Sequence, residues 1–279
     1  MRVSIINNGA EKAFAEGSER VHLVYDPAYK KGDVVCLKVE KPGFYEIRLE
    51  DTLPTTLVYL DGTEAEFPIP FGVMRAGFSP RSFTGKRHFI EARVSEETAD
   101  TEWMRRPRNL ALNPHDQTDN KGIYPHMSSN VEYEDSFRNK IFPDRGLFAP
   151  RNVIDGVLAN ESHRLYPHQS WGINRNPEAW LCCDFGRPVD TSELRLWIRG
   201  EFPHDSYWSS ITVKTSDGKE EVFELKKTRE CQSFPFDHKS ITSLTLCSLK
   251  KAIEPAQFPA LSLLEVIGWE SENKSGGAV

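Results

Sequence analysis

The chain has 279 residues, of which 38% are hydrophobic and 27% are charged, and its formal net charge at pH 7 is −6. Its length favours two domains that each bury a core, and its composition is typical of a soluble globular protein. No apolar run approaches the length of a transmembrane helix, and neither half has the basic stripe that binds nucleic acid. The sequence therefore predicts no membrane span and no nucleic-acid partner.

The first 95 residues contain short strand-like runs separated by turn residues. The runs cover residues 21–25, 34–39, 44–49, 56–60 and 88–94. Turn residues separate them at Lys31–Asp33, Lys41–Gly43 and Asp61–Gly62, a spacing typical of antiparallel sandwiches. Helical periodicity is nearly absent, so this part of the chain predicts a β-sandwich domain.

The change of domain is predicted near residue 105. Ser95 is followed by acidic residues and has the side chain of a helix N-cap, which predicts a short helix. The sequence Arg105–Arg108 contains a proline and breaks this pattern. We predict an N-terminal domain over residues 1–105, a second domain over 106–270 and a disordered tail over 271–279.

The second domain combines a long irregular stretch with strand patterns. From residue 109 to about residue 172 the chain is rich in Pro, His, Asn and Asp, and long loops of this kind are often functional. Strand alternation then follows in Leu194, Leu196 and Ile198, and again in Ile211 and Val213. The polar and aromatic residues 199–208 lie between these strands, so we expect them to form a ligand-binding loop.

Four segments of the second half resemble one family. They are residues 109–112, residues 149–156 with Ser170 and Trp171 downstream, residues 179–186 and residues 260–268. In this order they resemble the discoidin-like domains, which occur at the C-termini of coagulation factors V and VIII and among galactose-binding-like carbohydrate-binding modules. The resemblance implies an all-β chain whose second β-sandwich is a galactose-binding-like jelly roll with ligand loops at one end.

Many members of this family hold a structural calcium ion beside the Asp-Gly loop. The resemblance places Asp155 and Asn160 among its ligands, whereas Val157 and Leu263 stand where two further oxygen ligands are expected. Calcium takes six or more oxygens, so these apolar residues weaken the site. Calcium therefore stays open, and the alternative role of Asp155 is to hydrogen-bond within its own turn.

The loops of the second domain carry the side chains that recognise sugars. A sugar ring offers neighbouring hydroxyls to polar groups and a C–H face to an aromatic ring. The resemblance implies that the loop after the Asp-Gly motif and the loop after the central strand meet at one end. The predicted ligand contacts are His163, Tyr166, Arg175, Arg199, Glu201, His204 and Trp208.

Several of these aromatic and imidazole groups also have a structural interpretation. Trp171, Trp180 and Trp197 fit core positions, and Trp208 fits a packed strand entry as well as a ligand contact. The histidines His163, His168 and His204 are an alternative zinc set. Their spacing lacks the helical i, i+4 pairing of many zinc sites, which favours loop hydrogen bonding instead.

The sequence thus predicts a non-catalytic protein that binds carbohydrate through loops at one end of the second domain. One alternative is an enzyme acting on glycosides or polyuronates, for which Glu201 and Asp205 are the candidate carboxylates. Another is adhesion to protein or lipid through the apolar loop Phe142–Phe148.

Cysteine usage and the N-terminus bear on the cellular compartment. Five cysteines without a C-x-x-C pair predict neither a disulfide framework nor a zinc knuckle. The adjacent Cys182 and Cys183 are expected to face opposite sides of a strand. The first residues lack the apolar core of a secretory signal, so the expected location is cytoplasmic.

Overall fold

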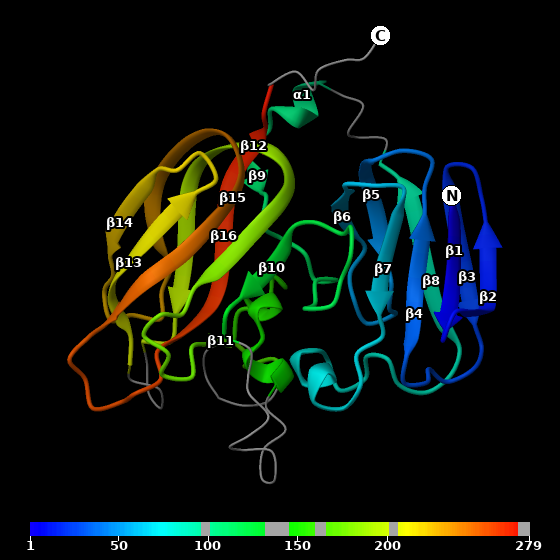
Figure 1. Ribbon diagram of the computed structural model, residues 1–279, viewed down its shortest axis with the longest axis horizontal. Coiled ribbons are helices and arrows are strands. Elements are labelled where there is room, and N and C mark those ends of the chain that lie inside the picture. Colours follow the sequence, from blue (N-terminus) through cyan, green and yellow to red (C-terminus); the bar gives the residue numbers. More distant parts are fainter. Residues whose placement is uncertain (96–100, 132–144, 160–165, 201–205, 273–279) are drawn as a thin grey trace.

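Two β-rich domains lie side by side in the computed structural model, which describes residues 1–95, 101–131, 145–159, 166–200 and 206–272 (Figure 1). The N-terminal domain is blue to cyan in Figure 1, and the C-terminal domain runs from green to red. Within these ranges, no helix has the length and apolarity that crossing a membrane requires. The all-β fold class predicted from the sequence is confirmed.

The N-terminal domain is a sandwich of two four-stranded antiparallel sheets. One sheet has the order β2-β1-β4-β7 and the other has the order β3-β8-β5-β6. Successive residues of a strand face opposite sides, so in β3 Val21, Leu23 and Tyr25 are buried while their neighbours are exposed. The strands are β1 (Arg2–Asn7), β2 (Ala10–Glu16), β3 (Arg20–Tyr25), β4 (Asp33–Lys38), β5 (Gly43–Arg48), β6 (Thr56–Leu60), β7 (Glu64–Pro68) and β8 (His88–Val94).

The C-terminal domain is one eight-stranded sheet that wraps around its own core. Its strand order is β11-β16-β12-β15-β13-β14, with β10 paired to β12 and β9 paired to β16. The strands are β9 (Arg108–Asn109), β10 (His126–Ser129), β11 (Trp171–Gly172), β12 (Leu181–Ile198), β13 (Trp208–Thr215), β14 (Glu220–Glu224), β15 (Gln232–Lys251) and β16 (Ala260–Glu270). Short helices are α1 (Thr101–Met104) and the 3-10 turns η1 (Gly72–Gly77), η3 (Arg145–Phe148) and η4 (Pro150–Val153).

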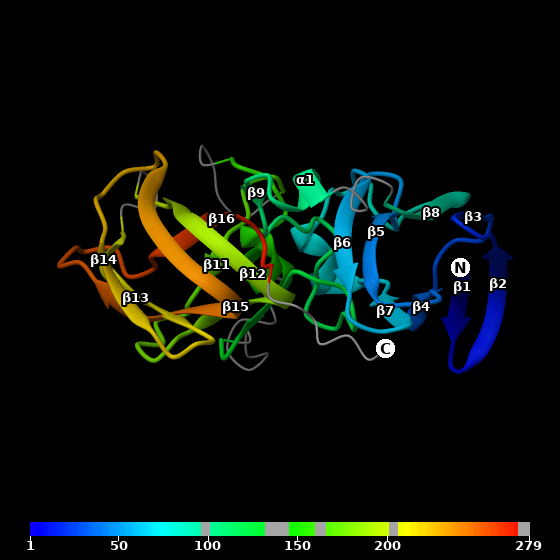
Figure 2. The same ribbon diagram turned by 90° about the horizontal axis from the view of Figure 1, so that it is seen from above.

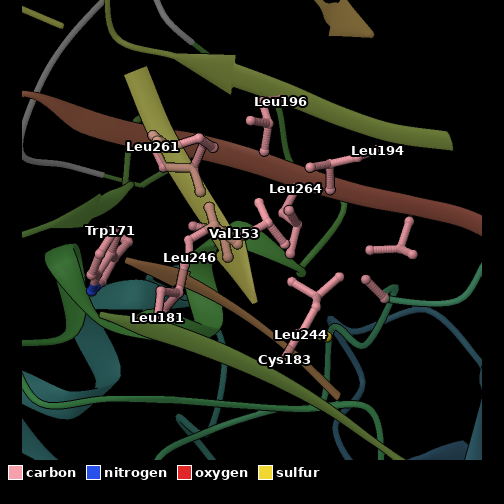
Figure 3. Packing of buried hydrophobic residues seen from close by; sticks show 14 of the residues in the cluster. Val153, Trp171, Leu181, Cys183, Leu194, Leu196, Leu244, Leu246, Leu261 and Leu264 are labelled. Atoms are coloured by element: carbon pink, nitrogen blue, oxygen red, sulfur yellow. The ribbon is translucent and has the colours of Figure 1, made fainter. Parts of the chain in front are cut away.

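Two long strands allow a single sheet to form both layers of this jelly roll. β12 and β15 run through 18 and 20 residues. The first part of β12 pairs with β10 and its last part pairs with β16, with a shift of register after Asp184. The alternate residues of these strands meet in a leucine-rich core (Figure 3). Trp171 lies at one edge of that core in Figure 3.

A segment of the C-terminal domain covers the edges of both N-terminal sheets. The backbone of Tyr124 exchanges two hydrogen bonds of 2.9 Å with Tyr59 of β6, and Lys121 exchanges two with Glu66 of β7. Pairing in this way removes the exposed backbone groups of an edge strand. The guanidinium of Arg187 adds a contact 4.8 Å from the ring centre of Phe44, so β5, β6 and β12 lie close together (Figure 2).

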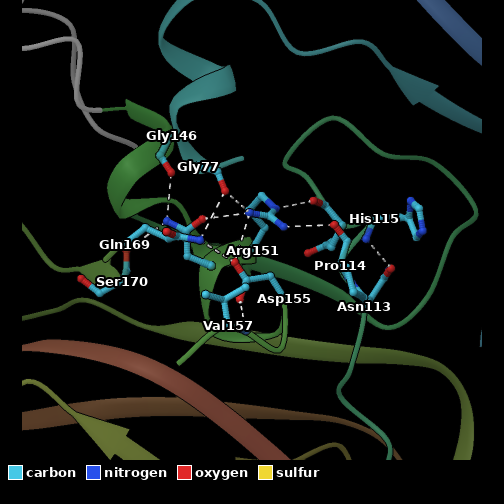
Figure 4. Close-up of polar contacts among 12 residues, drawn as sticks. Gly77, Asn113, Pro114, His115, Gly146, Arg151, Asp155, Val157, Gln169 and Ser170 are labelled. Atoms are coloured by element: carbon cyan, nitrogen blue, oxygen red, sulfur yellow. Dashed lines mark hydrogen bonds and ion pairs between the residues drawn. The ribbon is translucent and has the colours of Figure 1, made fainter. Parts of the chain in front are cut away.

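The junction between the domains contains a buried arginine, Arg151 (Figure 4). Its guanidinium donates hydrogen bonds to the carbonyl of Gly77 in the N-terminal domain (2.7 Å) and to the carbonyls of Asp116 (2.7 Å) and Pro114 (3.1 Å). It also lies 3.5 Å from the carboxylate of Asp155. A buried charge is tolerated only when it is paired and hydrogen-bonded, and these four groups meet that condition.

Two glycines bring the backbones of η1 and η3 into contact at the same junction. A Cβ atom on Gly77 would lie 2.4 Å from the carbonyl oxygen of Gly146, and one on Gly146 would lie 2.6 Å from the carbonyl oxygen of Val73. Both distances are far below van der Waals contact. Glycine is therefore required at both positions for η1 and η3 to approach this closely.

The predicted N-terminal strands at 21–25, 34–39, 44–49, 56–60 and 88–94 correspond to β3, β4, β5, β6 and β8, which confirms them. Strands β1, β2 and β7 were not predicted. The helix expected after Ser95 is found as α1, and residues 96–100 lie outside the described ranges.

Cys183 is buried and Cys182 is half-buried, on opposite faces of β12, as expected. The cysteines of the described chain are free.

We expect the stability of this junction to depend on pH through His115. Burial lowers the pKa of His115 to about 4, Arg151 and Arg48 act in the same direction, and the Pro54 carbonyl that its Nε2 contacts acts against them. The folded protein therefore holds a neutral imidazole, whereas the unfolded chain takes up a proton below about pH 6.5. The stabilisation is complete above that pH and is lost as the pH falls toward 4, by up to about 3 kcal/mol.

Urea denaturation at pH 7, 6, 5 and 4 measures this effect. His115→Gln keeps a donor for the Pro54 carbonyl but does not titrate, so its stability falls less over this range than that of the wild type. His22→Gln, which changes an exposed histidine of β3, serves as the control. Parallel curves for the wild type and His115→Gln would contradict the prediction.

Candidate binding rim of the C-terminal domain

One end of the C-terminal domain gathers polar and aromatic residues from four parts of the chain. We call it the binding rim and define it as residues 166–175, 199, 206–208 and 256–261. β11 pairs with the start of β16 through Trp171 and Leu261, and the amide of Arg199, after β12, donates to the carbonyl of Ala260 (2.9 Å). Ser206, before β13, donates its hydroxyl to Ala256 (3.1 Å). The rim is therefore built on strand ends that the sheet holds in place.

Two tryptophans form the floor of the binding rim. Trp171 and Trp208 are both buried, and their ring centres are 6.0 Å apart. Neither indole Nε1 has a hydrogen-bond partner, and the buried Oγ of Ser170 and Nδ1 of His168 have none either. An unpaired buried polar atom costs about 1–3 kcal/mol, and most buried polar atoms in proteins pair with protein groups or with ordered water.

The outer part of the binding rim carries Arg175 and Phe258. Arg175 is exposed, and its guanidinium carbon lies 4.5 Å from the ring centre of the half-buried Phe258. Stacking on the ring holds the guanidinium in one orientation while its edge donors stay directed outward. Tyr166 is half-buried in the same rim. Of the predicted ligand residues, Arg175 and Tyr166 are thus the described ones with accessible side chains.

Two other predicted ligand residues lie deeper. Arg199 is fully buried and its guanidinium is 3.4 Å from the carbonyl of His168, and the side chain of Trp208 is 1% exposed. Burial assigns both to the support of the rim in this structure, because β12 and β13 direct them into the core at their ends. The ligand contacts predicted for them stay predictions. Trp171 is buried as expected for a packing role.

Asp155, the predicted calcium ligand, is bonded to the chain itself (Figure 4). Its Oδ1 accepts the amide of Val157 (2.8 Å), and its Oδ2 accepts Nε2 of Gln169 (2.8 Å) and faces Arg151. Burial raises the pKa of Asp155, while Arg151, Val157 and Gln169 act in the opposite direction. Both oxygens of Asp155 are therefore hydrogen-bonded within the chain, and Asp155 makes the turn hydrogen bond expected of it.

Several predicted residues lie outside the described ranges. They are Asn160, His163, Glu201, His204 and Asp205, so the predicted sugar contacts, the zinc set and the pair of carboxylates among them stay predictions. Part of the loop predicted for adhesion is described. Leu147 is buried in η3, and the adhesion alternative stays a prediction.

Sequence reasoning missed two features of the rim. Phe258 lies in a loop whose composition carries no periodic signal, and only its contact with Arg175 distinguishes it. Gln169 and Ser170 follow the predicted His168, yet nothing in the sequence shows that they are buried. Burial of short polar residues in a loop depends on which strands cover them, and that information is not local.

Solved structures similar to this chain include sugar-binding modules. The lectin domain of lectinolysin complexed with Lewis B antigen aligns with 59% of this chain and 97% of its own, at 14% identity and a TM-score of 0.39. The family 32 carbohydrate-binding module of C. perfringens NanJ, in complex with galactose, aligns with 50% of this chain and 91% of its own, at 13% identity and a TM-score of 0.36. A Streptococcus pneumoniae fucose-binding module, SpX-3, covers 57% and 96%, at 12% identity and a TM-score of 0.37.

No protein-family profile matches the chain, and no curated protein matches it in sequence. At these identities and TM-scores, the function has to be argued from the chain's own residues.

We expect replacement of Arg151 to destabilise the protein strongly. Arg151→Met leaves the carbonyls of Gly77, Pro114 and Asp116 and the Asp155 carboxylate without their donor. Breaking a buried pair by removing one partner costs about 3–5 kcal/mol. Chemical denaturation followed by tryptophan fluorescence measures the loss.

Arg195→Met is the matched control, because Arg195 forms a partly exposed pair with Glu193 at 2.8 Å. Such pairs contribute about 1 kcal/mol or less. Equal losses of stability in the two variants would show that the buried network at Arg151 contributes no more to the free energy of unfolding than a partly exposed ion pair.

Proposed function

We propose that this protein binds carbohydrate, without catalysis, at the binding rim of its C-terminal domain. The observation that carries the proposal is the accessible guanidinium of Arg175, which stacks on the ring of Phe258 near the ends of β11 and β16. Arg175, Phe258 and Tyr166 supply the accessible part. Trp171 and Trp208, which are both buried, support this part of the rim from below.

The chemistry of a sugar ring matches these groups. A guanidinium presents parallel N–H donors that fit two neighbouring hydroxyls or a carboxylate. Aromatic rings cover the C–H face of the sugar, and the tyrosine hydroxyl donates or accepts at its edge. Most of these hydrogen bonds replace bonds to water, so the net gain for each is small and the expected affinity for a single sugar is weak.

Resemblance of the sequence to discoidin-like domains gives the proposal independent support. The segments that carry it include Ser170 and Trp171 and residues 260–268, which the structure brings to the binding rim or to the strand beside it. The residues of the resemblance and the residues of the rim therefore coincide in part, although they were identified by different criteria.

Binding to a panel of immobilised glycans, followed by calorimetry with the best sugar, tests the proposal. We expect Arg175→Ala to weaken binding at least tenfold, because the forked donor is lost, and Tyr166→Phe to weaken it several-fold. Lys219→Ala is the control and should bind as the wild type does, since Lys219 lies beyond the opposite end of β13 from Trp208.

Three results would count against the proposal. One is a folded protein that binds no glycan. Another is sugar binding that neither rim variant affects. Release of reducing sugar from a bound glycan would favour the enzymatic alternative, for which Glu201→Gln is the diagnostic variant.

A further inference from the structure

A second group of chemically active residues lies in the N-terminal domain, far in sequence from the binding rim. Glu50 and Asp51 follow β5, and His88 begins β8, the strand next to β5 in the sheet. One ligand atom from each of the three residues lies within 4.8 Å of the other two. Neighbouring strands thus bring an imidazole and two carboxylates to one end of the sheet.

Two of these side chains, Glu50 and His88, are buried, and each has one polar atom without a hydrogen-bond partner. The side chains of Glu50 and His88 are each 2% exposed, and the distance from Glu50 Oε2 to His88 Nδ1 is 3.8 Å, which is too long for a hydrogen bond. Glu50 Oε2, His88 Nε2 and the hydroxyl of the neighbouring Tyr29 have no hydrogen-bond partner. The unpaired Glu50 Oε2 faces the imidazole of His88, and an unpaired buried carboxylate oxygen is costly unless something binds there.

Two other histidines of the chain form direct hydrogen-bonded pairs with a carboxylate, which we call closed pairs. His126 Nδ1 is 2.7 Å from Asp116 Oδ1, and the second oxygen of Asp116 accepts the amide of Met127 (3.0 Å). His238 Nε2 is 2.6 Å from Glu221. Each of these histidines reaches its carboxylate directly. The Glu50 and His88 pair stays open, and it has a second carboxylate beside it.

Burial shifts the pKa of both Glu50 and His88. Burial raises the pKa of Glu50 to about 7, and the neighbouring Asp51 also raises it, while the backbone amides of Phe83 and Asp51 and the charge of Arg48 lower it. Burial lowers the pKa of His88. Both groups are therefore held away from their charged forms, and a divalent cation would stabilise a carboxylate and a neutral imidazole together.

We propose that Glu50, Asp51 and His88 form a binding site for a first-row divalent transition metal, with zinc as the ion that best fits it. A mixed set of imidazole nitrogen and carboxylate oxygen suits zinc and its neighbours, whereas calcium and magnesium take oxygen alone. Zinc lies about 2 Å from each ligand, which places its ligands roughly 3–4 Å apart. The three ligand atoms lie within 4.8 Å of one another, so a bound ion would draw them closer together.

The surroundings suit this role. Tyr29 stacks on the imidazole of His88, with ring centres 3.9 Å apart, and fixes its plane. Asp51 is exposed and provides the route from solvent. Three protein ligands leave a fourth position for water, as in zinc sites that are not closed by four side chains.

Calorimetry with zinc chloride, on full-length protein without an affinity tag and stripped of metal by a chelator, tests the proposal. We expect one zinc ion per chain, and with cobalt(II) visible absorption bands of a protein-bound ion. Glu50→Gln and His88→Gln should abolish binding. Asp51→Asn should weaken it at least tenfold while the metal-free protein melts as the wild type does. The reason is that an asparagine oxygen can still accept the amide of Phe89, which Asp51 accepts at 3.2 Å.

Two controls separate this site from other histidines. His238→Gln removes a buried histidine that has one carboxylate partner, and it should bind zinc as the wild type does. His168→Gln removes a histidine of the binding rim. The absence of zinc binding overturns the proposal, as does binding that survives Asp51→Asn and His88→Gln. Zinc binding lost in His168→Gln but kept in Asp51→Asn places the ion at the rim and overturns it as well. If the buried variants fail to fold, Asp51→Asn decides.

Discussion

The buried guanidinium of Arg151 is the interaction on which the arrangement of this molecule depends. It donates to Gly77 from one domain and to Pro114 and Asp116 from the other, and it faces Asp155. Carbonyl oxygens and one carboxylate replace the water that the cation loses on burial, so the charge is tolerated only while all of them stay in place. The hydrogen bonds of Arg151 therefore fix how the two sandwiches meet, and apolar contact at the same boundary adds to the stability of the junction.

The hydrogen-bond network around Arg151 also positions the binding rim. Asp155 holds Gln169, which precedes Ser170 and Trp171, so the loop that carries the rim is tied through one carboxylate to the junction. In a metal-dependent domain a bound ion could perform this task. Here the guanidinium of Arg151 supplies the positive charge. The loop is therefore held by side chains of the protein itself, which cannot dissociate as an ion can.

Strand alternation and turn residues predicted the all-β fold, because both signals are local. The same signals were present but overlooked in β1 and β2, where Asn8 and Gly9 form the turn with positive φ values of 50° and 75° that hairpins require. The site was less accessible to sequence reasoning. Loop composition indicated Tyr166 and Arg175, whereas the burial of Arg199 and Trp208 depends on where β12 and β13 meet the core. Glu50 and His88 become neighbours only through the pairing of β5 with β8.

The rim and the domain junction are linked by buried contacts, and these contacts are better understood as a scaffold than as a route for signals. Gln169 bonds to Asp155, which faces Arg151, and Arg151 bonds to the carbonyl of Pro114. The next residue, His115, contacts the carbonyl of Pro54, which lies three positions beyond Asp51 in the sequence. Coupling between two sites requires an element with two arrangements that both ligands bias. The links from Gln169 to Pro114 are buried hydrogen bonds and an ion pair whose loss leaves polar groups unpaired, so a second arrangement would be costly. The same chemistry that fixes the domains therefore favours independent binding at the rim and at the proposed metal site.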